Sequence, residues 1–293
     1  MISRRVFGQI CAAAVVFGRR LLGAAGRAPL SWASQPECGT GWTRQYRAHA
    51  QIILLGIPVF HPSDVGDGSA SWREWAGNDG EMVRLLEFTG RSAPERAGGL
   101  NRFGFIQELS RSGEAIYFGL MTSSPEESAA EARQALHANA KDAWYSAIDG
   151  RMSADGIETG RAHFLASAKT TPANRQILIE RARQELAAAP RTKSEAGILP
   201  QPFLHALASL LGDSQKKQTQ YAYNGRMYWL TAERAREAKS PGVVRVNGSL
   251  RRVEGGKPIE FRLWVEGASP HPLPLRIEYQ AKSYLRLTFE AKA

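Results

Sequence analysis

The residues best suited to chemistry in this chain gather in one glycine-rich segment, His61-Pro62-Ser63-Asp64-Val65-Gly66-Asp67-Gly68. An imidazole and two carboxylates can share proton transfer when they lie within hydrogen-bond reach of one another. A calcium loop would need more carboxylates at alternating positions and a bidentate glutamate, so the segment predicts no metal site. Segments of this composition also form plain turns, which is the structural alternative.

One catalytic hypothesis uses these residues. A hydrolase-type enzyme would combine His61, Asp64 and Asp67. The fold would also have to bring Arg102 or Glu108 close to them, because proton-transfer partners must touch. The chain has no Gly-x-Ser-x-Gly elbow, and its six histidines show no metal-ligand spacing. The sequence therefore identifies no cofactor, and the hydrolase stays an alternative hypothesis.

Two further patterns favour structural interpretations. The run Gly98-Gly99-Leu100-Asn101-Arg102-Phe103-Gly104 departs from the dinucleotide-binding pattern and opens no helix, so we interpret it as a bulge or a close backbone approach. Basic and aromatic residues interleave at Arg226-Met227-Tyr228-Trp229 and at Lys282-Ser283-Tyr284-Leu285-Arg286. Such residues can stack nucleic-acid bases on an exposed sheet, but the same pattern is typical of cross-strand packing.

The N-terminus carries the pattern of an export signal. Ser3-Arg4-Arg5-Val6-Phe7 stands directly before a short apolar run, Gly8–Gly18, which is too short to cross a bilayer. The segment resembles twin-arginine (Tat) signals through Arg4, Arg5 and Phe7, although Gly8 and Gln9 replace the usual leucine and lysine. The resemblance implies the export machinery as a partner, cleavage after Ala28 or Ala33, and a periplasmic or extracellular location. The general secretory route and an uncut basic tail of a cytosolic protein are the alternatives.

Charge and cysteine content narrow the classes of partner. The net charge is +10, but five basic residues and no acidic ones precede residue 34, so the remaining chain carries only +5. Nucleic-acid binding thereby loses its main support. Cys11 lies in the export segment, which leaves Cys38 as a single thiol without an internal disulfide partner. No later stretch reaches the roughly 18 uncharged apolar residues of a membrane span, so the mature chain should have none.

The order of expected elements predicts one α+β domain over residues 46–293, after an export signal (1–33) and a leader loop (34–45). Residues 46–60 read as one long bent strand, and residues 69–121 as a meander of paired strands. Three helices should follow, over residues 124–139, from Thr171-Pro172 onward, and over 202–211. Between the first two helices, residues 144–148 and 161–168 read as short strands around a glycine-rich loop. Residues 190–201 read as a linker.

A second meander closes the chain. Asn224-Gly225 lies between aromatic runs, which is a strong hairpin signal. Residues 260–290 contain three stretches in which apolar and charged residues alternate, as expected for strands with one buried and one wet face. The fold class predicted is therefore α+β, with a curved antiparallel β-sheet of two meanders packed against about three helices.

The order of elements over residues 46–290 resembles the exported carriers of the lipoprotein-localisation type, in which a curved antiparallel sheet wraps helices around an apolar cavity. Segments such as 101–108 and 274–280 also look like those of uncharacterised exported bacterial proteins, from which no functional residue can be carried over. We therefore predict a non-catalytic exported protein that binds an apolar or amphipathic ligand, such as a lipid, or an envelope partner. A structural envelope protein that uses its sheet surface for contacts is a further alternative.

Overall fold

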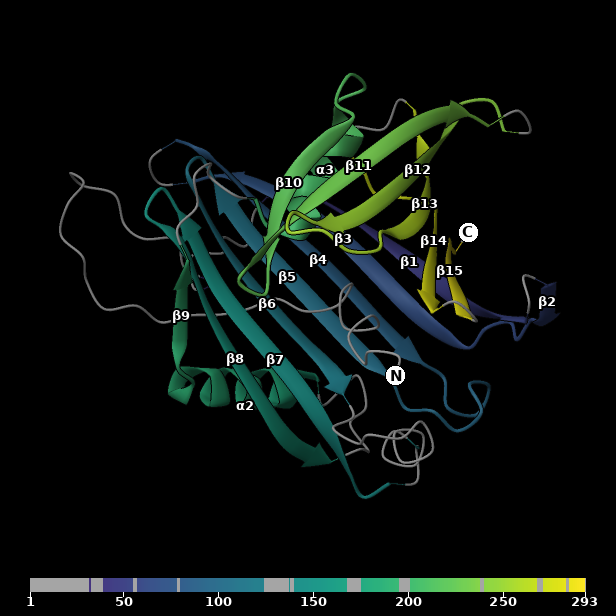
Figure 1. Ribbon diagram of the computed structural model, residues 1–293, viewed down its shortest axis with the longest axis horizontal. Coiled ribbons are helices and arrows are strands. Elements are labelled where there is room, and N and C mark those ends of the chain that lie inside the picture. Colours follow the sequence, from purple (N-terminus) through teal and green to yellow (C-terminus); the bar gives the residue numbers. More distant parts are fainter. Residues whose placement is uncertain are drawn as a thin grey trace.

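A single antiparallel sheet of 15 strands makes up most of the protein (Figure 1). The computed structural model describes residues 32, 39–54, 57–77, 80–123, 137, 140–167, 175–194, 201–237, 240–267, 271–282 and 285–292. The first strands are β1 (Thr40–Leu54), β2 (Ile57–Phe60), β3 (Gly66–Ala76), β4 (Met82–Ser92), β5 (Phe103–Arg111), β6 (Glu114–Ser123), β7 (Asp142–Ser153) and β8 (Gly156–Ser167).

The second half of the chain begins with helix α2 (Arg175–Ala188), strand β9 (Arg191–Ser194) and helix α3 (Phe203–Gly212). Its remaining strands are β10 (Gln218–Tyr223), β11 (Arg226–Arg236), β12 (Val243–Arg252), β13 (Ile259–Glu266), β14 (Arg276–Lys282) and β15 (Leu285–Ala291). The strand order is β10-β11-β12-β13-β14-β15-β1-β3-β4-β5-β6-β7-β8-β9, and β2 pairs with the end of β1.

The predicted α+β class with about three helices is wrong. The described residues contain two helices, and the two expected meanders are parts of one continuous sheet. Residues 142–167 form the long hairpin β7–β8 rather than two short strands around a loop, and β9 lies in the expected linker. The helix expected over 124–139 falls almost wholly outside the described residues, as do the export segment around Arg4, Arg5 and Phe7 and the thiol of Cys38.

One further expectation is corrected and two are confirmed. The expected bent strand 46–60 is instead the antiparallel pair β1 and β2, and β1 already begins at Thr40, inside the expected leader loop. Helix α3 matches the expected helix 202–211. The hairpin β10–β11 turns at Asn224 and Gly225, whose φ angles of 56° and 67° suit the tight turn that matches strand twist.

The two halves of the sheet are joined by the pairing of its first and last strands. Residues 46–52 of β1 lie opposite residues 285–291 of β15, in antiparallel register. On its other edge β1 pairs with β3 through residues 40–48. The first strand is thus central in the sheet, and the short strands β9 and β10 form its two edges.

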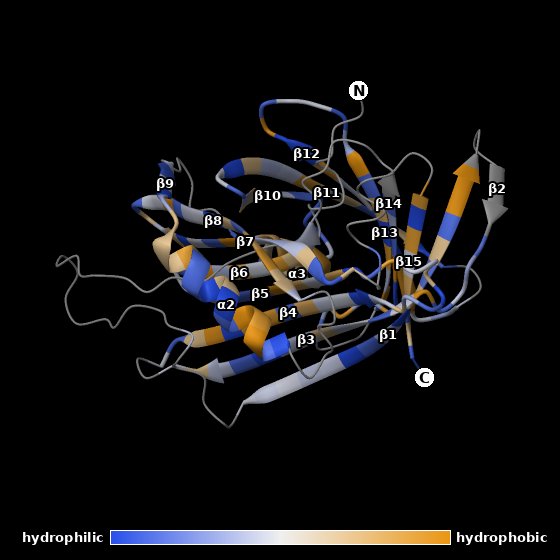
Figure 2. Ribbon diagram, turned by 90° about the horizontal axis from the view of Figure 1, so that it is seen from below, coloured by the Kyte–Doolittle hydropathy of each residue, from blue (hydrophilic) through white to orange (hydrophobic). Residues whose placement is uncertain are grey.

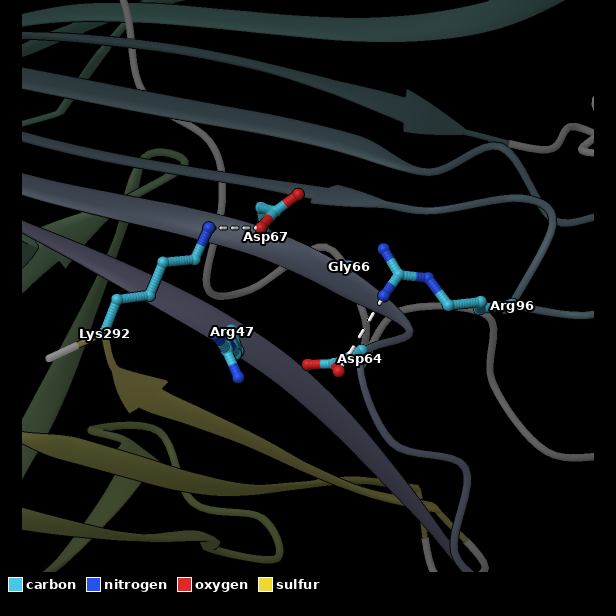
Figure 3. A pocket seen from close by; sticks show the side chains of 6 residues that line it. All are labelled: Arg47, Asp64, Gly66, Asp67, Arg96 and Lys292. Carbon is cyan, nitrogen blue, oxygen red and sulfur yellow. Dashed lines mark hydrogen bonds and ion pairs between the residues drawn. The ribbon is translucent and has the colours of Figure 1, made fainter.

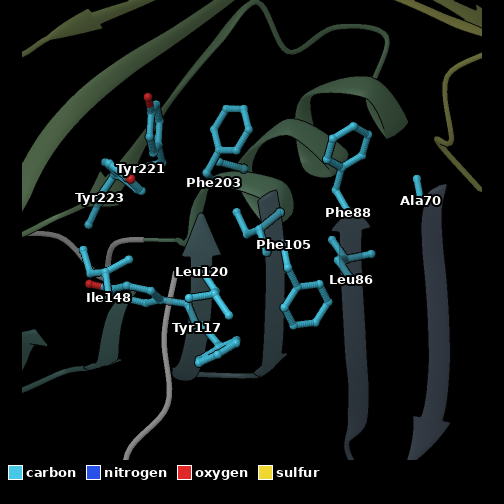
Figure 4. Packing of buried hydrophobic residues seen from close by; sticks show 14 of the residues in the cluster. Ala70, Leu86, Phe88, Phe105, Tyr117, Leu120, Ile148, Phe203, Tyr221 and Tyr223 are labelled. Atoms are coloured by element: carbon cyan, nitrogen blue, oxygen red, sulfur yellow. The ribbon is translucent and has the colours of Figure 1, made fainter. Parts of the chain in front are cut away.

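The sheet curls around α3 (Figure 1). This helix contacts β10 and β11 at one end of the strand order and β4 and β5 near the middle of the other half. Its buried residues Phe203, Ala206 and Leu210 belong to the same core cluster as Phe88 of β4 (Figure 4). An Arg161 guanidinium of β8 also donates a hydrogen bond, at 2.7 Å, to the carbonyl of Asn224 in the β10–β11 turn. We call the face that carries α3 the concave face.

Helix α2 packs on the opposite, convex face. Its Arg175 and Arg183 guanidinium groups lie over the rings of Phe105 and Phe118, at 5.0 and 5.8 Å from the ring centres. The side chain of Asp149 is fully buried at this face and accepts hydrogen bonds from Arg191 of β9. Burial raises the pKa of Asp149 to about 6, against the opposing effect of Arg191.

Glycine allows one aromatic side chain to lie flat across a neighbouring strand. Tyr117, Gly150 and Thr159 stand opposite one another on β6, β7 and β8. A Cβ atom on Gly150 would collide with the Tyr117 ring. Without it, the Tyr117 hydroxyl reaches Thr159 Oγ1 at 2.9 Å, which gives a buried polar group its hydrogen-bond partner.

Candidate functional site

A charged pocket of about 270 Å³ opens on the convex face, and the residues that line it are Arg47, Asp64, Gly66, Asp67, Arg96 and Lys292 (Figure 3). Asp64 and Asp67, both expected as site residues, thus lie in one place. Arg47 comes from the middle of β1, Asp67 from the start of β3, and Lys292 directly follows β15. The pocket therefore depends on the joining of the first and last strands.

Asp67 is held in its ionised form by two cations. Its Oδ1 accepts a hydrogen bond from Lys292 Nζ at 2.6 Å, and its Oδ2 lies 3.4 Å from an Arg91 guanidinium nitrogen. The hydrogen bond from Lys292 is the largest influence that lowers the pKa of Asp67 below its ordinary value. Asp67 is therefore a carboxylate at neutral pH, and its charge is already compensated.

Asp64 sits in a strained loop. Its φ angle of 51° is uncommon for a residue other than glycine. The backbone N–H of Asp64 donates to His49 Nδ1 at 3.2 Å, so His49 accepts at Nδ1 and its proton lies on Nε2. The Asp64 carboxylate approaches Arg96 only to 3.8 Å, beyond hydrogen-bond distance. Unusual backbone angles that the surrounding structure maintains cluster at functional sites.

The other residues of the hydrolase hypothesis lie elsewhere. His61 does not line the pocket, and its Nδ1 lies 3.0 Å from Gln51 Nε2. Arg102 does not line the pocket either, and its backbone N–H donates a hydrogen bond to Ser92 Oγ at 2.6 Å. His61 lies in the loop before β3, and Arg102 directly precedes β5.

Glu108 faces the interior rather than the pocket. Asp67 stands opposite Arg91, which stands opposite Phe103 of β5, so these three share the convex face. Glu108 is an odd number of residues from Phe103 and points to the concave face, because strand side chains alternate. Glu108 therefore shares no site with Asp64 and Asp67, and the hydrolase hypothesis loses that partner.

Instead, Glu108 forms a buried pair with α3. It has no exposed surface, and its Oε2 lies 3.1 Å from both the backbone nitrogen and Nδ1 of His205. Glu108 Oε1 and His205 Nε2 are buried without hydrogen-bond partners in the described part of the chain. Sequence patterns gave no reason to pair these two residues, which are far apart in the chain.

The concave face has an apolar rim where β1 ends and β15 begins, away from α3. We use this name for Ala50, Ile52, Leu285 and Leu287 on the adjacent strands β1 and β15. Ile52 is 38% exposed, and the other three side chains are half-buried. The hydrophobic colouring of this end of β1, beside β2, is visible in Figure 2. Tyr279 of β14, opposite Leu287, closes the rim toward the core.

Sequence reasoning missed Arg47, Arg96 and Lys292 as site residues. One signal was available for Arg47, because it lies between Tyr46 and Ala48, whose burial puts the guanidinium on the opposite face.

The aromatic pattern at Tyr228 is cross-strand packing, with its ring 5.1 Å from that of Tyr221. Gly98 and Gly99 adopt positive φ angles in the turn that carries Arg96.

Comparisons with known proteins give little guidance. No protein-family model matches the chain, and no curated protein matches it. Among solved structures, a beta-barrel-like protein of domain of unknown function DUF1849 from Brucella abortus is similar, with a TM-score of 0.46 and 8% identity. The similarity covers 85% of this chain and 95% of that chain. At this level it carries no argument about function. Within the described residues, no helix has the length and apolarity needed to cross a membrane.

Proposed function

We propose that this protein is a non-catalytic binding protein that holds the apolar part of an amphipathic ligand, or of an envelope partner, against its apolar rim. The observation that carries the proposal is the graded exposure of the concave face. Side chains under α3 are buried, whereas Ile52, Leu285 and Leu287 on β1 and β15 remain partly open to solvent. Neighbouring apolar side chains that stay partly open to solvent make this strip a candidate binding surface.

The positions of these residues support binding of an apolar group at the rim better than they support catalysis. Of the expected catalytic residues, Asp64 and Asp67 are partnered by cations, and Glu108 lies on the other face of the sheet. The rim, by contrast, joins strands that pair in regular register, Ile52 opposite Leu285 and Ala50 opposite Leu287. A rigid apolar strip of this kind can bind an acyl chain or an apolar side chain without losing much conformational freedom.

The test is binding of a dansyl-labelled fatty acid to the purified protein, together with mass spectrometry of co-purified lipid. Ile52→Asp places a charge in the rim and should weaken probe binding about tenfold or more, because the ligand would have to cover an unpaired carboxylate. Ile177→Asp on α2, at a side chain 65% exposed on the convex side, is the matched control and should bind as the wild type does.

Probe binding that both substitutions weaken equally would contradict the assignment to the rim. Absence of probe binding together with absence of co-purified lipid would contradict an apolar ligand. Near-ultraviolet circular dichroism of each variant shows whether the fold is kept, and Leu287→Asp provides a second rim variant.

We further propose that residues 1–33 direct export of the folded chain through the twin-arginine route. The support is the sequence Ser3-Arg4-Arg5-Val6-Phe7 before a short apolar run. In a Gram-negative host, the full chain should reach the periplasmic fraction, and Arg4→Lys with Arg5→Lys should retain it in the cytoplasm. Equal export of the double variant would point to the general secretory route, and a wild-type chain confined to the cytoplasm would contradict export.

A further inference from the structure

We infer that the convex pocket is a binding site for a phosphate group, built around Arg47. The site is independent of the apolar rim, which lies on the other face of the sheet. Apart from Gly66, every residue that lines the pocket carries a charged side chain. A pocket with this lining suits a small ion or an ionic group and offers nothing to an apolar ligand.

Arg47 is the available cation of the pocket. It is exposed and has no hydrogen bond or ion pair with any residue in the described ranges. Its cross-strand neighbours are both acidic, Asp67 on β3 and Glu290 on β15. Each of these carboxylates is already engaged, Asp67 with Lys292 at 2.6 Å and Glu290 with Arg276 at 3.0 Å. The guanidinium of Arg47 therefore keeps its donors for a ligand.

Two more cations border the same space. Arg96 comes from the turn after β4, where it lies 3.5 Å from the carboxylate of its exposed neighbour Glu95 and 3.8 Å from Asp64. Lys292 comes from the residue after β15. The lining side chains thus carry three positive and two negative formal charges, and outside the lining Arg91 beside Asp67 is balanced by Glu95 beside Arg96. The surplus is positive, so an anion is the ligand that the pocket favours.

The backbone around the pocket is rigid. Gly66 lies so close to β4 that a Cβ atom there would collide with the carbonyl oxygen of Arg91. Asp64 is fixed in its positive-φ conformation by the hydrogen bond to His49. The Ala93 N–H also donates to the carbonyl of Val65 at 2.7 Å, which ties the Arg96 turn to the loop before β3. The cations are therefore presented by elements that do not need to reorganise on binding.

The directions of the cations select the shape of the anion. One arginine fork satisfies a planar carboxylate by itself. Here the cations arrive from three separate elements, β1, the 94–99 turn and the end of the chain, around one open space. A tetrahedral anion with three or four oxygens can accept from all three, so a phosphate group fits the pocket better than a carboxylate does.

Isothermal titration calorimetry on the full chain tests the inference with inorganic phosphate, glycerol phosphate and acetate. In a parallel measurement, vesicles of phosphatidylcholine with phosphatidic acid distinguish a lipid headgroup from a free phosphate. Arg47→Ala should weaken phosphate binding about tenfold or more, because a charge-assisted hydrogen bond is lost. Arg251→Ala is the matched control, since Arg251 is an exposed strand arginine of β12 outside the pocket.

Arg47-dependent binding of any of the three phosphate sources supports the site, and the source that binds most tightly identifies the ligand class. The inference is overturned if no phosphate source binds, if Arg47→Ala and Arg251→Ala weaken binding equally, or if acetate binds as tightly as phosphate. Ile52→Asp should leave phosphate binding unchanged, so failure of this site and failure of the apolar rim give different results.

Discussion

At the scale of single residues, Glu108 shows how one carboxylate can serve two structural tasks. Its Oε2 accepts from the His205 imidazole and from the His205 backbone N–H in the first turn of α3. Pro202, which precedes the helix, provides no side-chain cap, so the sheet supplies the acceptor that the helix start requires. A negative charge at this position also favours the positive end of the helix dipole.

Removing Glu108 alone should therefore destabilise the fold. We expect Glu108→Leu to lower the free energy of unfolding by about 2 kcal/mol, because buried donors of His205 lose their acceptor. Urea denaturation followed by circular dichroism measures the change. The double variant Glu108→Leu with His205→Leu should recover part of the loss, since an apolar pair leaves fewer buried polar groups unpaired. A single variant as stable as the wild type would contradict this account.

At the scale of elements, two charged side chains from different halves of the sheet hold the two ends of α3. Its last turn contains no basic residue. The guanidinium of Arg234, from β11, instead donates to carbonyl oxygens at the end of the helix, among them those of Leu210 and Asp213. Glu108 at the start and Arg234 at the end thus complement the helix dipole from two strands that are distant in sheet order.

Loss of Arg234 should loosen the end of α3 more than the sheet. We expect Arg234→Ala to lower the opening free energy of amides in residues 208–212 by about 1–2 kcal/mol, because charge-assisted hydrogen bonds to those carbonyls disappear. Native-state hydrogen exchange measures this region by region. Arg236→Ala, an exposed arginine near the end of the same strand, is the control and should leave α3 unchanged. Equal protection of α3 in both variants would refute the capping role.

Element identity was predictable wherever local chemistry decides it. Asn224-Gly225 specified its hairpin through positive φ angles, and the alternation over residues 260–290 specified three strands. The sequence indicates a linker over residues 190–201 because the β9 segment is short and polar, and its pairing with β8 is a tertiary effect. The α+β class failed because the long hairpin β7–β8 continues the sheet, where local patterns indicated short, separate strands.

At the scale of the whole molecule, the curl of the sheet separates two surfaces with different chemistry. The concave face carries α3, the Glu108–His205 pair and the apolar rim. The convex face carries α2 and the charged pocket. Because β1 contributes alternate residues to both, Ile52 to the rim and Arg47 to the pocket, this one strand positions both proposed sites.

The sequence alone determined local features: strand alternation, the Asn224-Gly225 turn and the closeness of Asp64 to Asp67 in the chain. The export signal at its start stays a prediction. These depend on backbone preferences and side-chain period, which act over a few residues. Only the tertiary structure decided that β1 pairs with β15, that Lys292 and Arg47 meet Asp67 in one pocket, and that Glu108 points away from it to His205. Those outcomes depend on pairing and contacts between segments that are distant in the chain, and no local pattern specifies the register of strands that a tight turn does not join.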